Sequence, residues 1–323
     1  MKHRQTPNLH RLRERAELLK NLRQFFDGRG FFEVQPPCLS SDCVIDPYID
    51  PLRVSTSEFQ LSADWEGEFF LQTSPEAAMK RMLAAGAPSI YSIGPVFRAG
   101  EQGEQHNLEF TMLEWYQVGA DVEQGIQLLG ALASSILNAK HFEVRPYRQL
   151  FRDACGLDPI DAPLQSVLEY ARHIDASLAD SLVEDRDGLL DLILSLVIQP
   201  NLGHECPTIV RDYPLSQAAL AKPSTQDGQC AARFELFVSG VELANGYDEL
   251  RDPDVLLDRF RACNDKRQKT GRRPLPLEIP LLEAMRSGLP QCAGVALGVD
   301  RLLTVQMGET EISSVMPFTI LTA

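Results

Sequence analysis

Apolar residues recur at helical spacing close to the start of the chain. Between residues 12 and 26 they fall three or four positions apart, with arginine and glutamate between them, which predicts an amphipathic helix. The segment FFEVQPP, residues 31–37, follows and predicts a strand. This strand should end at Pro36 and Pro37, because proline has no N–H to donate to a sheet ladder.

The same kinds of pattern continue along the chain and predict strands in two blocks with helices between them. Further strands are expected at residues 67–73, 90–97, 108–118, 233–243 and 293–299. Helices are expected at residues 75–85, 122–138, 163–179, 187–198, 253–269, 280–287 and 300–307. Strands in blocks, without regular alternation with helices, favour an α+β fold over βαβ units.

Composition narrows the class of protein. With 323 residues and 44% apolar content the chain can bury a large core, and it lacks a run of about 18 apolar residues that would span a membrane. The N-terminus has no apolar signal core, so we expect a cytoplasmic protein. The formal net charge of −14 argues against general attraction to a polyanion such as tRNA.

The cysteines and one basic run qualify this picture. Seven scattered cysteines without a CxxC pair predict reduced thiols rather than a disulfide framework or a zinc cage. The run RACNDKRQKTGRR, residues 261–273, is the strongest local concentration of positive charge. It is either a patch for an anionic partner or a solvated helix end, and the sequence leaves both open.

Polar residues enter the strand predicted at 108–118. Alternate residues of a strand face one side, so Phe110, Glu114 and Tyr116 share a face with apolar neighbours. A carboxylate and a phenol are costly there unless they meet partners. The alternative is a sheet edge with Glu114 exposed. Upstream, Arg98 follows a strand and precedes a glycine-bearing loop, an arrangement typical of anion binding.

A second group of acidic residues lies in GVELANGYDEL, residues 240–250. Glu242 and Glu249 stand seven apart across Asn245-Gly246, a dipeptide typical of hairpin turns, so a hairpin is expected to bring both carboxylates to one site. Two carboxylates near an arginine suit magnesium with a polyphosphate, because magnesium takes oxygen ligands and shares them with phosphates. The alternative is a surface hairpin with solvated acids.

The third segment of interest is CAGVALGVDRLLTVQMG, residues 292–308. Gly294 and Gly298 in an apolar strand mark places where a ligand or another backbone comes close, and Arg301 opens the helix that follows. A glycine pair alone is weak evidence. The three segments together predict a site for phosphate, metal and a planar ring.

These segments resemble the three sequence motifs of class II aminoacyl-tRNA synthetases, in particular the lysyl branch. The first helix with GFFEVQPP is similar to motif 1, FRAGEQGEQHNLEFTMLEWY to motif 2 and GVALGVDRLL to motif 3, while TSPE and ELANGYDEL match the lysyl enzymes. The resemblance covers almost the whole chain. It implies a mainly antiparallel sheet flanked by helices, one catalytic domain over residues 1–323, a helical insertion at roughly 145–230 between motifs 2 and 3, and a homodimer.

Two features point to a particular branch of that family. The chain begins at the motif 1 helix, so we expect no anticodon-binding domain and no tRNA partner. Ala296 also stands where lysyl enzymes have the middle glycine of G-x-G-x-G, and one added methyl in a close-packed pocket is felt. The chain therefore resembles the ligases that join (R)-β-lysine to a lysine of elongation factor P. The alternatives are a truncated lysyl-tRNA synthetase paralogue that activates α-lysine and a catalytically silent, synthetase-like regulator.

The resemblance implies ATP and Mg²⁺ as cofactors and gives roles to individual residues. Arg98 at the α-phosphate and Arg301 on one face of the adenine would be catalytic, with Phe110 on the other face of the ring. The other residues expected to bind ATP are Gly100, Glu101, Asn107, Glu242, Leu243 and Gly298. The residues expected to bind the amino acid are Ser74, Glu76, Glu114, Tyr116, Glu249 and Ala296, and those expected to bind magnesium are Glu242 and Glu249.

Motif 2 departs from the pattern of many relatives. Ala99 and Gly100 stand where Asn and Glu are common, and Leu108 replaces a proline. The contacts of those Asn and Glu side chains are therefore not expected here, and Glu101 is the residue that could substitute for them.

Overall fold

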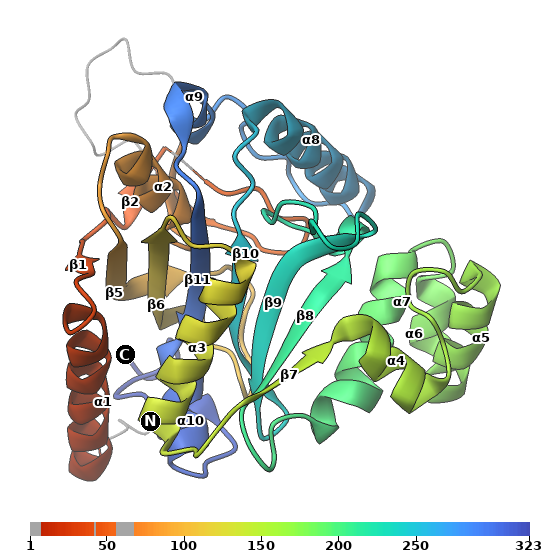
Figure 1. Ribbon diagram of the computed structural model, residues 1–323, viewed down its shortest axis with the longest axis horizontal. Coiled ribbons are helices and arrows are strands. Elements are labelled where there is room, and N and C mark those ends of the chain that lie inside the picture. Colours follow the sequence, from red (N-terminus) through yellow and green to blue (C-terminus); the bar gives the residue numbers. More distant parts are fainter. Residues whose placement is uncertain (1–7, 42, 56–67) are drawn as a thin grey trace. The chain divides into compact units, whose positions relative to one another are not determined.

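The computed structural model describes residues 8–41, 43–55 and 68–323 (Figure 1). The chain forms two compact units, one made of Met1–Ala120 with Leu250–Ala323 and the other of Asp121–Glu249. The single catalytic domain expected over the whole chain stays a prediction. The strands and helices of each unit are given separately below.

Four strands of the large sheet belong to the first unit, in the order β1-β5-β6-β11 (Figure 1). Their bounds are β1 Phe32–Glu33, β5 Ile90–Phe97, β6 Glu109–Val118 and β11 Cys292–Gly298. β1 pairs with β5 in parallel, whereas β5 with β6 and β6 with β11 are antiparallel. The strands predicted at 90–97, 108–118 and 293–299 are confirmed. The strand predicted at 31–37 is wrong beyond Glu33, because two prolines follow within four residues.

Six helical segments accompany this sheet in the first unit. They are α1 Leu9–Asp27, α2 Glu76–Ala84, α8 Pro253–Lys269, α9 Pro280–Gly288, α10 Val299–Gln306 and the 3₁₀ turn η4 Ile312–Ser314. α8 begins where Asp252 accepts bonds from the N–H groups of Asp254 and Val255, with Pro253 in the first turn. The five helices predicted in these parts of the chain are confirmed.

Helix α1 covers one face of the first unit's sheet. Phe26 is fully buried, and its ring centroid lies 4.9 Å from that of Tyr91 and 5.1 Å from that of Trp115. Tyr91 and Trp115 are opposite each other on β5 and β6, so they point to the same side. Their neighbour Glu114 points to the other side. One face of the sheet therefore packs against α1, and the opposite face carries Glu114.

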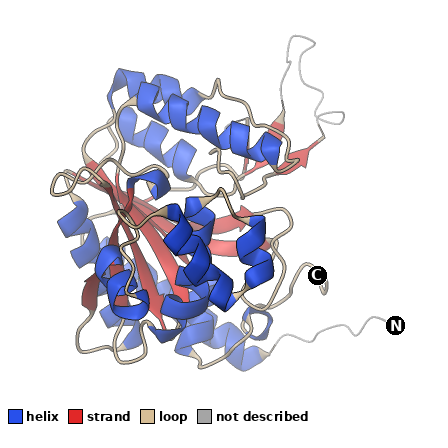
Figure 2. Cartoon of the chain, turned by 90° about the vertical axis from the view of Figure 1, so that its right-hand side faces the viewer, coloured by secondary structure: helices blue, strands red, loops and turns tan. Residues whose placement is uncertain are grey.

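A second, three-stranded antiparallel sheet also belongs to the first unit, and its strands are among those drawn in red in Figure 2. Its strands are β2 Leu39–Ser40, β4 Phe69–Leu71 and β3 Leu52–Val54, in that order. β4 confirms the strand predicted at 67–73 in its middle part, although Gly67 lies outside the described residues.

The second unit holds the strands β7 to β10, in the order β10-β9-β8-β7. Their bounds are β7 Glu143–Pro146, β8 Thr208–Pro214, β9 Cys230–Val238 and β10 Val241–Asp248. β7 pairs with β8 in parallel, and the other two pairings are antiparallel. Both units together thus have a mixed, mainly antiparallel strand arrangement flanked by helices, which confirms the α+β class.

The position of the β9–β10 hairpin corrects the sequence prediction. Asn245 and Gly246 lie inside β10, opposite Glu235 and Phe234, and the turn is at Ser239-Gly240. Both turn residues have positive φ, 51° and 76°, as a two-residue loop between antiparallel strands requires. The turn at this point leaves the whole of β9 free to pair with β8 and β10, which a turn six residues later would prevent.

Most helices of the second unit lie between β7 and β8, where Figure 1 shows α4 to α7 in one group. The helical bounds are α3 Val122–Leu137, α4 Tyr147–Cys155, α5 Leu164–Ile174, α6 Ala176–Ser181, α7 Arg186–Ile193, the π turn η1 Leu194–Ile198 and the 3₁₀ turns η2 Gln199–Asn201 and η3 Leu215–Gln217. The helix predicted at 163–179 is divided at Asp175, whose side chain accepts from the Leu178 N–H and so starts α6.

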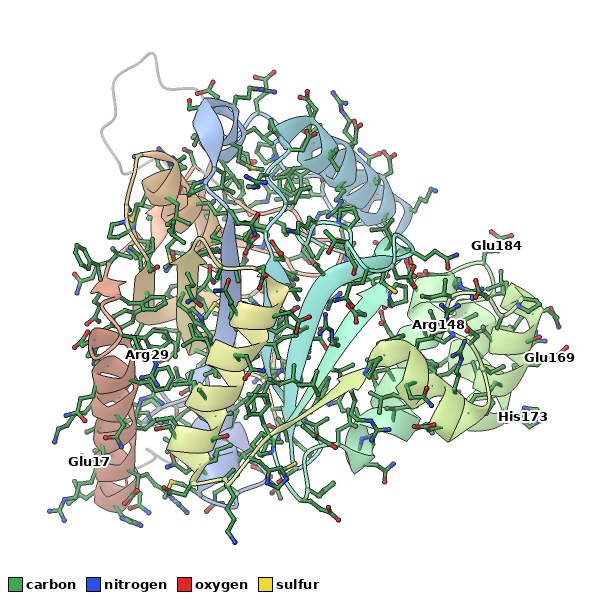
Figure 3. The ribbon with its side chains drawn as sticks, viewed as in Figure 1. Glu17, Arg29, Arg148, Glu169, His173 and Glu184 are labelled. Carbon is green, nitrogen blue, oxygen red and sulfur yellow. The ribbon has the colours of Figure 1, made fainter. Side chains whose placement is uncertain are left out.

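The group α4 to α7 has its own apolar core. Tyr147, Phe151, Leu190 and Ile193 are fully buried together with Phe237 of β9. On the surface, Arg148 of α4 pairs with Asp158 at 2.7 Å, and Figure 3 marks this arginine together with Glu169 and His173 of α5. The assignment of residues 145–230 as a family insertion remains a prediction.

The remaining predictions about surface chemistry have clear outcomes. All seven cysteines are free thiols. In the described residues no helix is both long and apolar enough to cross a bilayer. In the basic run, Arg267 is buried against the carbonyls of Asp46 and Ile49 and pairs with Asp50, and Arg272 pairs with the same carboxylate. The run is therefore largely a structural helix end.

Candidate active site

Side chains along β6 alternate between the two faces of the sheet, and this places Phe110, Glu114 and Tyr116 on one face. Glu114 lies opposite Ser92 of β5 and Ala296 of β11, and Tyr116 lies opposite Gly294. Residues paired across antiparallel strands point to the same side, with Cβ atoms about 5 Å apart. The methyl of Ala296 is therefore a neighbour of the Glu114 carboxyl, which places the predicted specificity residue beside a predicted amine ligand.

Glu114 is buried and held by two neutral donors. Its side chain is 2% exposed, which rules out the alternative of a solvated acid at a sheet edge. Ser74 Oγ donates to Oε2 at 2.6 Å, and Tyr116 Oη donates to Oε1 at 2.7 Å. Ser74 Oγ also accepts from the Glu76 N–H at 3.0 Å, so the start of α2 is tied to the floor of the site.

Glu76 is buried as well, and it forms an ion pair with Lys80. Lys80 Nζ lies 2.5 Å from Glu76 Oε1, one helical turn along α2, and Lys80 is fully buried. The same ammonium lies 5.9 Å from the centroid of the Tyr116 ring. The sequence analysis did not include Lys80 in the site. The signal was present, because Glu and Lys four residues apart on a predicted helix are neighbours.

The environment of Glu114 opposes its negative charge. Burial, and then the neighbouring Glu76 carboxylate, raise the pKa of Glu114 from 4.5 to about 7, while the bonds from Ser74 and Tyr116 and the Lys80 ammonium act in the opposite direction. A carboxylate with a pKa near 7 exchanges its proton readily at neutral pH. A cation that entered beside it would favour the ionised form.

Two arginines lie at the other end of this face, on either side of the motif 2 loop. Arg98 follows β5, donates from Nε to the Thr73 carbonyl at 3.3 Å and lies 5.2 Å from the Phe110 ring centroid. Its Nη1 lies 3.6 Å from Glu101. Phe110 and Glu114 are four residues apart on β6, about 13 Å at a rise of about 3.3 Å per residue. This spacing suits a nucleotide at one end and an amino acid at the other.

Arg301 begins α10 and contacts the same loop. Its Nε donates to the Gln105 carbonyl at 3.1 Å, and its Nη2 lies 2.6 Å from His106 Nε2. Burial, and then the Arg301 charge, lower the pKa of His106, and Arg98 and Glu101 also act on this ring. Direct contacts therefore join Arg301 to His106 and Arg98 to Glu101 within the same loop.

The start of α10 is fixed by an anchor below Arg301. Asp300 is 1% exposed, pairs with Arg15 of α1 at 2.5 Å and accepts from the Thr111 N–H at 2.6 Å. Gly298 precedes this helix, and an added Cβ there would meet the Arg301 side chain at 3.8 Å, an ordinary contact. The packing of the protein therefore leaves room for a side chain at position 298. A ligand that lies close to the backbone would instead require glycine there.

The motif 2 loop has its own internal bonds. Arg98 N–H donates to the Leu108 carbonyl at 2.9 Å, which closes the loop, and Gly100 has a φ of 80°, a conformation that favours glycine. The Asn107 side chain donates to the Glu109 carbonyl at 2.6 Å and accepts from the Ile320 N–H at 3.2 Å. Asn107 thus joins the loop to the C-terminal segment.

The second unit carries the two predicted metal ligands, Glu242 on β10 and Glu249 directly after its last residue, Asp248. In a regular strand residues seven apart point to opposite sides. Glu242 pairs with Phe237 and Ala244 with Leu236, so Leu243 is an extra residue that forms a β-bulge. The bulge shifts the alternation of the side chains by one residue. The predicted Asn-Gly turn between Glu242 and Glu249 is wrong, and a shared site for the two carboxylates stays a prediction.

Glu249 is not a solvated acid. It is 1% exposed and forms a bridge with Ala221, next to the buried ion pair of Lys222 with Asp248 at 2.8 Å. Glu235 of β9 shares the face through its pairing with Asn245, accepts from Tyr213 Oη at 2.5 Å and pairs with Arg233. The sequence analysis did not name Glu235, although RFE in an alternating strand places an acid on that face.

The carboxylate chemistry of Glu242 and Glu249 fits magnesium. Both are oxygen donors, one on β10 and one directly after it, and magnesium is commonly held by one or two carboxylates together with substrate phosphates. Among the described residues, no three or more His, Cys, Asp and Glu side chains gather as a self-sufficient metal site. The donor set therefore suits a metal ion that arrives with a nucleotide.

Comparison with known proteins gives a consistent assignment. The family "tRNA synthetases class II (D, K and N)" matches residues 1–322. A protein of Vibrio vulnificus named elongation factor P--(R)-beta-lysine ligase is 41% identical over 314 residues, which are 97% of this chain and 96% of the relative. Proteins of the same name from Pasteurella multocida and Yersinia enterocolitica are 40% and 39% identical, over 97% and 96% of this chain and 96% and 94% of theirs.

The match extends over nearly the full length of this chain and of each relative. The identities of 39% to 41% are well above the level at which proteins share a fold and a family. The chain accordingly belongs to the class II tRNA synthetases of the D, K and N type and, within them, to the elongation factor P--(R)-beta-lysine ligases.

Proposed function

We propose that this protein uses ATP to activate the carboxylate of (R)-β-lysine and transfers the acyl group to the ε-amine of a lysine on elongation factor P. In the first step a carboxylate oxygen attacks the α-phosphorus, and pyrophosphate leaves. In the second step the acceptor amine attacks the acyl carbon, loses a proton, and AMP leaves. Membership of the ligase family is the single observation that carries this proposal.

The first step needs positioning and charge neutralisation more than covalent chemistry. Arg98 is assigned to the α-phosphate, and Arg301 and Phe110 to the two faces of the adenine, because a guanidinium plane stacks well on an aromatic ring. The contact of Arg98 with the Phe110 ring and the contacts of Arg301 with Gln105 and His106 support these roles. Gly100, Glu101, Asn107, Leu243 and Gly298 complete the proposed nucleotide contacts.

Glu242 and Glu249 would hold magnesium, which would supply positive charge next to the phosphates. Their carboxylate oxygens, the donors that magnesium prefers, support this assignment. Glu249 is also a candidate for the substrate amine. We further propose that the enzyme acts as a homodimer in the cytoplasm, where its acceptor works, and without tRNA.

The amine-binding part of the site comprises Ser74, Glu76, Glu114, Tyr116 and Ala296. A diamino acid carries two ammonium groups, and the buried carboxylates of α2 and β6 offer the complementary charge. The reactive carboxylate would then point along β6 toward the arginines at Phe110. This direction follows from the order of the acidic and basic residues on the same face.

Replacement of Ala296 by glycine should weaken the choice of β-lysine over α-lysine. The methyl stands beside Glu114, so its loss admits an amino group in a shifted position. A methyl-sized change in a pocket is worth about 1 to 3 kcal/mol, so the ratio of kcat/KM values for the two amino acids should fall roughly 5- to 150-fold. Pyrophosphate exchange with each amino acid measures the ratio. An unchanged ratio would remove Ala296 from specificity.

The function itself is tested by mixing the protein with ATP, (R)-β-lysine and elongation factor P and weighing the factor by mass spectrometry. One added β-lysyl group on a lysine of the factor is the expected product. Modification with α-lysine at equal efficiency would instead favour a lysyl-tRNA synthetase paralogue. AMP formation without any change of the factor would show an activating enzyme with a different acceptor.

A further inference from the structure

Three charged side chains are buried together in the first unit, and one of them has no role in the reaction described above. Glu76, Lys80 and Glu114 are 8%, 0% and 2% exposed. Lys80 is paired with Glu76 through Nζ and Oε1 at 2.5 Å and lies over the Tyr116 ring at 5.9 Å. A fully buried lysine is costly unless it is paired, so its place beside a cation-binding site calls for an explanation.

The groups around Glu114 divide into neutral and charged ones. Ser74 and Tyr116 donate to its two oxygens, and Ser92 of β5 and Ala296 of β11 lie opposite it in the sheet. The charged groups that act on it both come from α2, and they are Glu76 and Lys80. With Glu114 ionised the three charges sum to −1, and with Glu114 protonated they sum to zero.

We propose that Lys80 is the internal countercharge of the β-lysine site: it pairs with the Glu76 carboxylate and holds it in place, so that Glu114 alone exchanges its proton for an ammonium group of the substrate. This inference rests on the proposed function and deepens it. The ammonium of Lys80 and that of the substrate then occupy complementary positions, each next to one carboxylate. The charge of the site stays at zero when one substrate ammonium enters and one proton leaves.

The reason lies in the electrostatics of paired carboxylates. Two carboxylates in one buried site cannot both be ionised without a cation, and one of them takes up a proton. Lys80 removes that conflict for Glu76 but not for Glu114, whose pKa stays near 7. Below this pH, protons compete with the substrate for Glu114, and the apparent affinity falls by up to about tenfold per pH unit.

Isothermal titration calorimetry of (R)-β-lysine with the full chain tests this exchange. Titrations at pH 6.0 and pH 8.0, each in two buffers of different ionisation enthalpy, give the number of protons released. We expect about 0.9 proton at pH 6.0 and about 0.1 at pH 8.0 for a group with a pKa near 7. The dissociation constant should be higher at pH 6.0 than at pH 8.0, by about fivefold or more.

Two variants separate Lys80 from a merely structural residue. Lys80→Met leaves both carboxylates without their countercharge, so proton release at pH 8.0 should rise to more than 0.5 and the pH midpoint should move up by about one unit or more. The double variant Glu76→Gln with Lys80→Met again has one ionisable group, so its proton release should return to the wild-type pH profile, although loss of the Glu76 charge should weaken binding at every pH. Neutral replacement of a buried ion pair is often tolerated, so this variant guards against misfolding.

Lys20→Met is the matched control, because Lys20 pairs with Glu17 at 3.7 Å on exposed α1. It should bind β-lysine with wild-type proton release. Absence of proton release by the wild type at pH 6.0, or a double variant that keeps the profile of Lys80→Met, would overturn the countercharge role. Folded protein that binds no β-lysine at either pH would instead overturn the proposed substrate. If that protein bound α-lysine with the same proton release, the result would support the countercharge role and reject β-lysine as the substrate.

Discussion

Replacement of Arg301 by alanine should abolish ATP–pyrophosphate exchange and leave the fold intact. The guanidinium is the proposed stacking partner of the adenine, and it contacts the motif 2 loop through the Gln105 carbonyl and His106. Loss of one preorganised charged group of an active site commonly costs about 100- to 1,000-fold in rate, and we expect at least this much. Exchange assays at saturating (R)-β-lysine, with circular dichroism to verify folding, measure the effect.

The control for this prediction is Arg286→Ala on α9. Arg286 is half exposed, and its nearest acid, Asp254, is 4.0 Å away, so its removal should change neither exchange nor stability appreciably. Arg301→Lys should not restore activity, because an ammonium lacks the flat guanidinium that covers a ring. Exchange at more than a tenth of the wild-type rate in Arg301→Ala would exclude the assigned role.

Replacement of Glu114 by glutamine should weaken β-lysine binding while it stabilises the free protein. Glutamine keeps an acceptor for Tyr116 but provides no charge for an ammonium group, and hydrogen bonds to charged partners are worth about 1.5 to 3 kcal/mol. The dissociation constant of (R)-β-lysine should therefore rise by about tenfold to 150-fold. Calorimetric titration at pH 8.0 gives this value, and binding as tight as in the wild type would contradict the role of Glu114.

The gain in stability should depend on pH in a defined direction. The pKa of Glu114 is raised in the folded state, so the folded protein binds more protons than the unfolded chain between about pH 4.5 and pH 7. Stability therefore decreases as the pH rises through this window, and the loss is complete above pH 7. Glutamine does not ionise, so the variant should exceed the wild type by on the order of 2 kcal/mol at pH 8.0 and by little at pH 4.5.

Urea unfolding of both proteins at pH 5.0, 6.5 and 8.0 measures this difference. The extra stability of Glu114→Gln over the wild type should grow as the pH rises to about 7 and stay constant at higher pH. A difference that shrinks with rising pH would mean that the Glu114 carboxylate stabilises the folded protein. Its burial would then be offset by the Ser74 and Tyr116 bonds, and the site would be preorganised without an energetic cost.

Several parts of the site follow from local patterns in the sequence. The alternation in residues 108–118 places Phe110, Glu114 and Tyr116 on one face, and the register of β6 bears this out. Arg98 is predicted to follow a strand and Arg301 to open a helix, and in the structure both side chains contact the motif 2 loop. Lys80 could have been included, because its spacing from Glu76 on a predicted helix is enough to suggest the pair.

Other parts were beyond a local reading. The Asn245-Gly246 dipeptide favours a turn, yet both residues are paired within β10. The pairing of β9 on both its sides outweighs a local turn preference, which is worth little compared with a full ladder of strand contacts. The division of the helix predicted at 163–179 at Asp175 is a further case, in which the side chain caps the second helix.

By itself the sequence determined the helices and strands with strong periodicity, the reduced cysteines and the residue types of a phosphate and amine site, because spacing along one segment decides which side chains share a face. The tertiary structure alone decided the burial of Glu114, its position beside Ala296 and the β-bulge at Leu243 in β10. These features depend on the register between strands distant in sequence, and the desolvation that raises the pKa of Glu114 exists only once the chain is packed.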